Sequence, residues 1–222
     1  MKKYCEKCIY HSLEGINKDF KRDEFIFLDG DKLDYVYLIL SGFVKVSKTT
    51  QNGDERIFDI IGKNDFIGLV AALKEDENYI ATAQALGDVV VKKIPLKQIK
   101  ESFHSNAVFK DLCFKCTVTR TNLFQSHLFN NSSGHLEDKI MVTLEYLTKK
   151  FGSYSNRGYI LKLPFSKTVL ASIIGVRRET LSRKLSEMKK KNIIEIENNT
   201  YIFDRMWLIS HTIFILYETI QI

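Results

Sequence analysis

The chain has 222 residues, of which 45% are hydrophobic and 27% charged, and it carries 15 Phe and 10 Tyr. This composition excludes a disordered chain and provides apolar side chains for one large domain or two ordinary ones. The formal net charge is +6, and residues 177–191 alone hold seven basic and two acidic residues. Positive charge concentrated in about one helix of sequence favours a polyanionic partner, most commonly nucleic acid, over a solvated basic helix.

Targeting and membrane segments are not expected. No stretch near the start is long and apolar enough for a signal peptide, and no run reaches the roughly 18 apolar residues of a membrane span. The apolar stretch 207–217 is interrupted by Ser210, His211 and Thr212, so we interpret it as a packed terminal element. We therefore expect a cytoplasmic protein with no membrane partner, whose four cysteines are reduced.

Residues 23–95 have the pattern of a β domain. Alternating β-branched and aromatic residues are interrupted by Ser41-Gly42, and Asn52-Gly53 is a typical hairpin turn. A further turn is bracketed by Gly62 and Gly68. Short strands at this spacing indicate a small barrel or roll. The expected strands are 35–40, 43–48, 56–61, 79–86 and 89–95.

Helical patterns follow Pro95. The longest predicted helix, over about 106–129, carries an apolar seam with a spacing of three to four residues. Such a seam packs either on its own domain or on a second copy of the chain. The polar stretch 130–135 is the expected domain boundary, and shorter helices are predicted at 96–103 and 136–151. The seam consists of Phe109, Leu112, Cys116 and Leu123.

The last part of the chain predicts a winged helix-turn-helix. Ser166 is the expected N-cap of a first helix that ends at Gly175. A second helix follows over 176–191, and a hairpin turns at Asn198-Asn199. Helix, glycine turn, helix and hairpin in this order are typical of that motif.

The second helix has the pattern of a recognition helix. If its apolar face, Leu181, Leu185 and Met188, points inward, polar side chains of its first turns point outward. Arginine binds guanine in a bidentate manner, and glutamate accepts a hydrogen bond from cytosine, so a G·C reader formed by Arg178, Glu179 and Arg183 is predicted. The remaining polar residues suit phosphate contacts. The full candidate set is Ser166, Arg177, Arg178, Glu179, Thr180, Ser182, Arg183, Lys184, Lys189, Lys190 and Lys191.

The stretch "IGVRRETLSRKLSEMKKKNII" resembles the helix-turn-helix of the CRP/FNR family of bacterial transcription regulators. "LDYVYLILSGFVKV", "GDERIFDIIGKNDFIG" and "VVVKKIP" are similar to the β-roll of that family in order and spacing, so the resemblance covers about residues 20–205. It implies an α+β fold with an N-terminal β-roll (a cyclic-nucleotide-binding-like jelly roll), a long dimerisation helix and a C-terminal winged helix-turn-helix. The expected domains are 1–105, 106–130 and 131–222.

The resemblance also implies a function. We expect a homodimeric transcription regulator that binds a palindromic operator in double-stranded DNA, with RNA polymerase as a further partner and the seam of the long helix at the dimer interface. Arg178, Glu179 and Arg183 match the base-reading residues of the family. Ser182 matches FNR-like members, whereas Arg178 is more typical of cAMP-type members, so the half-site is left open. A β-roll ligand-binding module whose C-terminal half contacts protein is the alternative.

The β-roll lacks the residues with which related proteins bind cAMP. Those relatives have a Gly-Glu and, about ten residues later, an Arg-Ser that binds the phosphate. Here Leu69 and Tyr79-Ile80 stand at those positions, next to the acidic stretch 75–77. We therefore expect an uncharged or aromatic effector instead of a cyclic nucleotide, or else a constitutive protein whose roll is filled by its own side chains. The expected effector pocket is lined by Leu69, Val70, Leu73, Tyr79 and Phe124.

An enzyme is not expected. A metal-dependent enzyme on a small barrel needs a His/Glu cluster on its strands, and none of the five histidines falls on a predicted strand. The chain also contains no P-loop, no G-x-S-x-G and no H-E-x-x-H motif.

The four cysteines form two C-x-x-C pairs, Cys5 with Cys8 and Cys113 with Cys116. Four thiolates suit Zn²⁺ or an iron–sulfur cluster, and a thiol pair suits redox sensing. FNR-type oxygen sensors, however, use more N-terminal cysteines and a distant one, and Lys92 stands near that distant position. We therefore expect ordinary apolar packing and no cofactor, with a metal, a cluster or redox sensing as alternatives.

Overall fold

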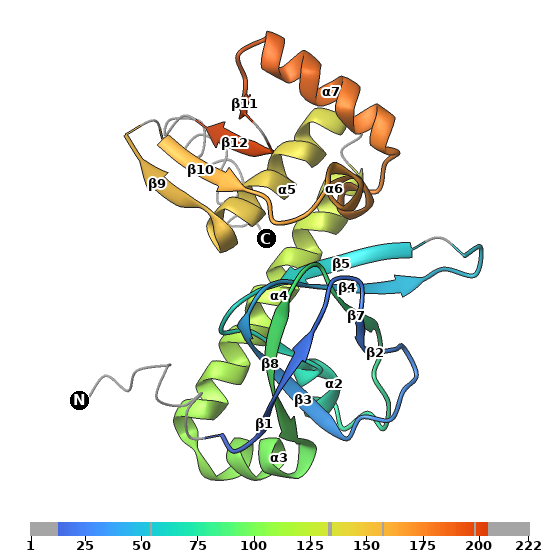
Figure 1. The fold of residues 1–222 in the computed structure, drawn as a ribbon, viewed down its shortest axis with the longest axis vertical. Helices are drawn as coiled ribbons and strands as arrows, with labels where there is room; N and C mark the ends of the chain where they lie inside the picture. The colour runs from blue at the N-terminus through green and yellow to red at the C-terminus, as the bar shows by residue number, and fades with distance from the viewer. Residues whose placement is uncertain (1–12, 54, 133–134, 157, 198, 204–222) are drawn as a thin grey trace. The chain divides into compact units, whose positions relative to one another are not determined.

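The computed structural model describes residues 13–53, 55–132, 135–156, 158–197 and 199–203, and of residues 119, 122–132 and 203 it describes the backbone alone. The chain divides into two compact units, Met1–Phe124 and Gln125–Ile222. The first unit is mainly β-structure, with the long helix α4 at its end, and the second combines helices with a small sheet (Figure 1).

Two antiparallel sheets form the β-roll of the first unit. Their strand orders are β1-β8-β3-β6 and β2-β7-β4-β5. Buried residues from both sheets, such as Val36, Val44 and Val91, belong to one hydrophobic core. The strands are β1 (Ile16–Phe20), β2 (Phe25–Phe27), β3 (Tyr35–Ser41), β4 (Val44–Thr49), β5 (Glu55–Ile61), β6 (Phe66–Ile67), β7 (Thr82–Ala85) and β8 (Val89–Pro95).

The turns predicted from glycine occur where expected. β3 ends at Ser41, and Gly42 has a φ of +84°. A Cβ at Gly42 would lie 2.3 Å from the carbonyl oxygen of Asp88, so a side chain does not fit there. The Asn52-Gly53 turn joins β4 to β5 in an antiparallel hairpin. These local signals confirm the expected roll.

Four short elements of the roll, β1, β2, β6 and α2 (Leu69–Leu73), were not predicted individually, and β6 lies inside the stretch expected as a turn. β1 pairs with β8 at a sheet edge, but four of its five residues are exposed, so its sequence shows no alternation of apolar and polar residues. The five-residue helix α2 is too short for a helical period to be recognised. The predicted strand 79–86 is also shorter in the structure, where β7 begins at Thr82.

Two helices close the first unit. α3 (Leu96–Ser105) and α4 (Ala107–Ser132) are separated by Asn106, whose side-chain Oδ1 accepts hydrogen bonds from the backbone nitrogens of Val108 and Phe109 at 3.0 and 3.1 Å. α4 continues through Ser132, so part of the polar stretch expected as a turn is helical.

At Phe109 the structure contradicts the predicted dimer seam of α4. Phe109 is fully buried in the β-roll core, and its ring meets Phe66 edge-on with centroids 6.2 Å apart. Leu112 and Cys116 pack half-buried against the same core. The side chain of Leu123 lies outside the described residues. The other three residues of the seam pack on their own unit. The sequence did not reveal this because α4 carries apolar residues on more than one side, and periodicity does not show which side meets the roll.

After α4, the described residues of the second unit form the helices α5, α6 and α7 and an antiparallel sheet of order β11-β12-β10-β9. α5 has the predicted bounds, whereas β9 and β10 were not predicted. Buried residues from α5, β10, α6 and α7, including Leu144, Leu161, Leu170 and Leu185, form its interior. The elements are α5 (Leu136–Phe151), β9 (Ser153–Ser155), β10 (Gly158–Lys162), α6 (Lys167–Ile174), α7 (Arg178–Lys190), β11 (Glu195–Glu197) and β12 (Thr200–Phe203).

Local chemistry defines the helix-turn-helix. The hydroxyl of Ser166 accepts a hydrogen bond from the backbone nitrogen of Val169 at 3.4 Å, which confirms the predicted N-cap of α6. Gly175 ends α6 in the left-handed conformation, with φ +80° and ψ +33°. Its N–H and that of Val176 donate to the carbonyl oxygen of Ala171 at 2.9 and 3.0 Å. The angle between α6 and α7 therefore depends on a left-handed residue.

Gly175→Ala should destabilise the protein by about 1–2 kcal/mol, because a Cβ disfavours the left-handed conformation. Gly175→Asn is the matched control. Asparagine tolerates the left-handed conformation, so this variant should lose much less of the free energy of unfolding. Urea unfolding followed by circular dichroism measures both variants. An alanine variant as stable as the wild type would show that the turn does not require its left-handed residue.

Candidate nucleic-acid interface

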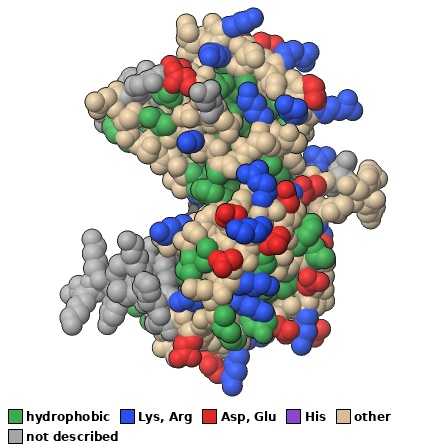
Figure 2. Space-filling view, viewed as in Figure 1, with side chains coloured by type: hydrophobic (Ala, Val, Ile, Leu, Met, Phe, Trp, Pro, Cys, Tyr) green, Lys and Arg blue, Asp and Glu red, His purple; other side chains and the backbone are tan. Residues whose placement is uncertain are grey.

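The orientation of α7 is fixed by its apolar face. Leu181, Leu185 and Met188 are 0%, 2% and 0% exposed, and α7 packs on α5 and α6. Arg178 and Arg183 are therefore exposed, as predicted. Figure 2 shows Lys and Arg side chains gathered over the part of the surface where α7 lies. A helix of this kind presents a cationic face to solvent and an apolar face to its own domain.

The first turn of α7 carries the residues predicted to contact bases. Arg177 occupies the N-cap position in extended conformation and makes no side-chain cap bond. Arg178 and Glu179 follow, both exposed, while Thr180 and Ser182 are half-buried. Together with Arg183, which is also exposed, these side chains place three cations and one carboxylate at the surface of the first turns of the helix. That combination suits guanine and cytosine edges in a major groove.

Lys184 is not free to reach a phosphate in this arrangement. Its ammonium nitrogen lies 2.8 Å from Oε2 of Glu137 on α5 and 3.6 Å from Oε2 of Glu187. The hydrogen bond from Lys184 holds the pKa of the Glu137 carboxyl below its usual value and raises the pKa of Lys184 itself. Lys184 therefore ties α7 to α5, a contact across 47 positions that the sequence did not indicate.

The wing is also tied to the helices. Nζ of Lys189 donates to the carbonyl oxygen of Ile196 at 3.0 Å, so this predicted phosphate ligand already contacts β11. Nδ2 of Asn199 donates to the carbonyl oxygens of Leu163 and Phe165 at 3.1 and 3.0 Å, which anchors the hairpin to the segment before α6. Lys190 and Lys191 are exposed. The Asn-Asn turn signal predicted the hairpin but not this anchoring role.

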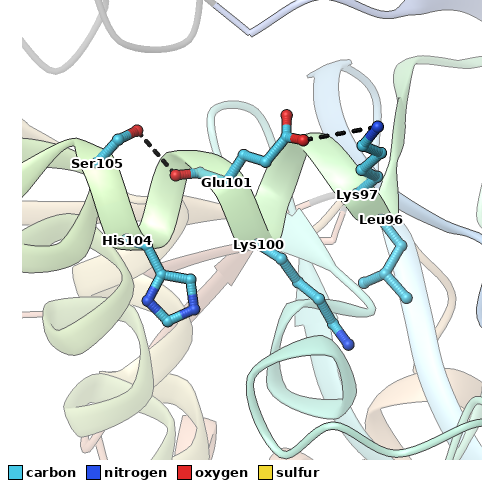
Figure 3. A pocket seen from close by; sticks show the side chains of 6 residues that line it. All are labelled: Leu96, Lys97, Lys100, Glu101, His104 and Ser105. Atoms are coloured by element: carbon cyan, nitrogen blue, oxygen red, sulfur yellow. Dashed lines mark hydrogen bonds and ion pairs between the residues drawn. The ribbon is translucent and has the colours of Figure 1, made fainter.

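The residues predicted to line an effector pocket mostly pack in the core. Leu69 and Tyr79 are 1% and 4% exposed, whereas Val70 and Leu73 are half-buried. The side chain of Phe124 lies outside the described residues. A different surface hollow, with a volume of about 680 Å³, lies along α3 (Figure 3), and an ion pair of 3.8 Å between Lys97 and Glu101 crosses its rim. It is lined by Leu96, Lys97, Lys100, Glu101, His104 and Ser105.

Of the two described cysteines, Cys113 lies in surroundings that favour the neutral thiol. Cys113 is fully buried, and burial raises the pKa of its thiol to about 12. The thiol of Cys116 donates a hydrogen bond to Oδ1 of Asp65 at 3.6 Å. Cys5 and Cys8 lie outside the described residues. Within the described part of the chain, no group of three His, Cys, Asp or Glu side chains is placed to hold a metal ion.

A β-roll in one unit and a winged helix-turn-helix with a cationic recognition helix in the other define a class of protein, the DNA-binding regulators with a sensor domain. Comparisons with known proteins agree. Residues 17–106 match the family model of the cyclic nucleotide-binding domain, and residues 141–210 match that of the Crp-like helix-turn-helix domain. The chain belongs to the CRP/FNR family and is a transcription regulator of that type.

Curated relatives and solved structures are similar over most of their length. The anaerobic regulatory protein of Bacillus subtilis is 24% identical over 193 residues, which cover 86% of this chain and 81% of the relative. The global nitrogen regulator of Nostoc is 26% identical over 182 residues, or 80% of each. The structure of FixK2 from Bradyrhizobium japonicum has a TM-score of 0.77 at 18% identity and covers 89% of this chain and 97% of that one. In the described parts of the chain, no helix has the length and apolar character needed to cross a membrane.

Native Cys113 should resist alkylation by iodoacetamide at pH 8, because the reagent attacks thiolates and this thiol has a pKa of about 12. Peptide mass mapping after labelling should find Cys113 unmodified in the folded protein and modified in guanidinium. Rapid labelling of Cys113 in the folded chain would contradict its buried placement and would revive a redox role for the pair.

Proposed function

We propose that the chain acts as a homodimer that binds a palindromic operator, with each α7 lying in a major groove. One observation carries the proposal: complete burial of Leu181, Leu185 and Met188 leaves Glu179 and Arg183 facing solvent on the opposite side of the helix, while Arg178 is exposed in the first turn. In helix-turn-helix proteins, the start of the recognition helix contacts base edges. RNA polymerase is a further partner suggested by membership of the family.

The proposed contacts divide into two kinds. Arg178, Glu179 and Arg183 read bases, because their groups match guanine and cytosine edges. Arg177, Lys190 and Lys191 are exposed and contact phosphates, which contribute affinity without sequence preference. Lys184 has a different role from the one expected, since its pairing with Glu137 assigns it to orienting α7.

The second copy is proposed to bind the outer side of α4. Phe114 is 70% exposed and Val118 is 40% exposed, in a helix whose other apolar side packs on the β-roll. Exposed residues on that outer side are spaced alternately four and three apart, which is the repeat of a coiled coil. They are Ala107, Asp111, Phe114, Val118 and Thr121. Pairing of two such helices supplies the twofold symmetry that a palindrome requires.

Control by cAMP or cGMP is not part of the proposal. Hydrophobic Leu69 and aromatic Tyr79 stand where relatives that bind cAMP carry the glutamate and arginine, and both side chains are buried. A cyclic phosphate placed among them would lose its hydration without gaining a cation. Exposed Glu75 and Glu77 lie close by in the sequence and would repel it further. Any effector of the roll is therefore proposed to be uncharged.

Selection from a random DNA pool should enrich a palindrome whose half-sites lie about one helical turn, roughly 10 base pairs, apart. Arg178→Ala should then cost about 1–3 kcal/mol and relax one base position. Lys190→Ala should weaken binding to selected and shuffled DNA alike and lower the salt slope by about one. Fluorescence anisotropy at several salt concentrations measures both. Equal loss of selectivity in the two variants would refute the division of roles.

Phe114→Glu should weaken or abolish the dimer, because it places a carboxylate in the proposed apolar contact between two α4 helices. Tyr154→Glu is the control: it makes the same kind of change at an aromatic residue that is 60% exposed on β9. Sedimentation equilibrium reports the association constant, and circular dichroism checks that both variants fold. If Phe114→Glu dimerises as tightly as Tyr154→Glu, α4 does not pair through this side.

A further inference from the structure

We propose that Tyr79 is an intramolecular ligand of the β-roll: its phenol occupies a built phenol-binding site and holds β2, β3 and α2 together without any small molecule. The site would accept another phenol only when Tyr79 is removed. The inference deepens the proposed function, because it concerns how the roll of the regulator is controlled, and it rests on that function for its DNA measurement alone.

The phenol of Tyr79 meets three separate segments. Its ring stacks on Phe27 of β2, with centroids 3.7 Å apart and planes 8° from parallel. Its hydroxyl donates to the carbonyl oxygen of Tyr35 at the start of β3, at 2.6 Å. Gly68, directly before α2, lies against the same ring, and a Cβ there would approach Cε1 of Tyr79 to 3.0 Å. Stacking, a directional hydrogen bond and a glycine that makes room are the features of a specific aromatic site.

The backbone of Tyr79 is fixed as firmly as its side chain. Its N–H donates to the carbonyl oxygen of Asp31 at 2.8 Å, and its own carbonyl oxygen accepts from the N–H of Gly30 at 2.9 Å. The N–H of Leu33 donates to the carbonyl oxygen of Glu77 at 2.9 Å. Main-chain bonds therefore hold this segment against the turn between β2 and β3 while the phenol points into the core.

This packing changes the role assigned to Tyr79. The sequence predicted Tyr79 as part of the wall of an effector pocket. In the structure its side chain is 4% exposed and stacked in the core, so it fills the space that a ligand would need. Burial also raises the pKa of Tyr79 well above its usual value, so the hydroxyl stays protonated and keeps donating at physiological pH. The roll is consequently complete by itself, and DNA binding by the wild type needs no ligand at this site.

Chemical rescue with p-cresol, which is the tyrosine side chain without its backbone, tests the inference on the full chain. Tyr79→Gly should lower the thermal midpoint, and p-cresol should raise it again by several degrees by filling the cavity. The same variant should bind its DNA site less tightly, and p-cresol should restore the affinity. Should Tyr79→Gly fail to fold in buffer, refolding in the presence of p-cresol should recover folded protein. Absence of any response of Tyr79→Gly to p-cresol would overturn the proposal.

Two controls separate this site from others. Tyr79→Phe keeps the ring and loses only the hydroxyl, so it should fold and should not respond to p-cresol. The wild type should respond to neither p-cresol, cAMP nor cGMP in thermal unfolding or isothermal titration. A response of Tyr79→Phe or of the wild type to any of the three would overturn the inference. If the wild type selects no DNA while Tyr79→Gly is rescued in stability, the proposed function fails and the phenol site stands.

Discussion

The burial of one face of α7 is the constraint on which the candidate interface depends. Each large apolar side chain removed from water contributes roughly 1.5–3 kcal/mol, and three of them, Leu181, Leu185 and Met188, are almost completely buried. Turning the helix about its axis would expose these three and bury Glu179 and Arg183, whose desolvation is costly. The ion pair between Lys184 and Glu137 adds a polar contact that favours the same orientation. The outward position of Glu179 and Arg183 is therefore a consequence of hydrophobic packing.

The burial of an apolar helix face also orients α4, but here the sequence predicted the helix and not the side of it that is buried. Both units, their order and the helix-turn-helix were predictable, because turns such as Asn52-Gly53 and Gly175 and the cap at Ser166 act over a few residues. The side of α4 that meets the roll was not, since Phe109 and Phe114 are equally apolar in the sequence and only the presence of Phe66 distinguishes them. The spacing of apolar residues predicts that a helix has an apolar face. Only the tertiary structure shows which element of the protein packs against that face.

Contacts between distant positions were the other limit of the sequence. The edge strand β1 is held by backbone bonds to β8 and has no side-chain pattern of its own. Lys184 looked like a phosphate ligand because nothing near it in the sequence revealed Glu137. Tyr79 looked like a pocket residue because its partners, Phe27 and Tyr35, lie more than forty positions away. The chemical character of Lys184 and Tyr79 was recognised correctly in the sequence. The role of each residue, like the position of β1, depends on a partner that is distant in the sequence and close only in the fold.

Different interactions stabilise the fold of the β-roll and the proposed complex of the second unit with DNA. The roll is held by apolar packing around residues such as Phe27, Tyr79 and Phe109, which salt does not screen. The proposed DNA contacts rely on exposed Arg and Lys side chains, whose attraction to phosphates falls steeply as salt rises. Raising the salt concentration should thus release DNA long before it loosens the roll. A roll that is already filled by its own tyrosine is consistent with this division, because its folded state then requires neither a bound anion nor a charged ligand.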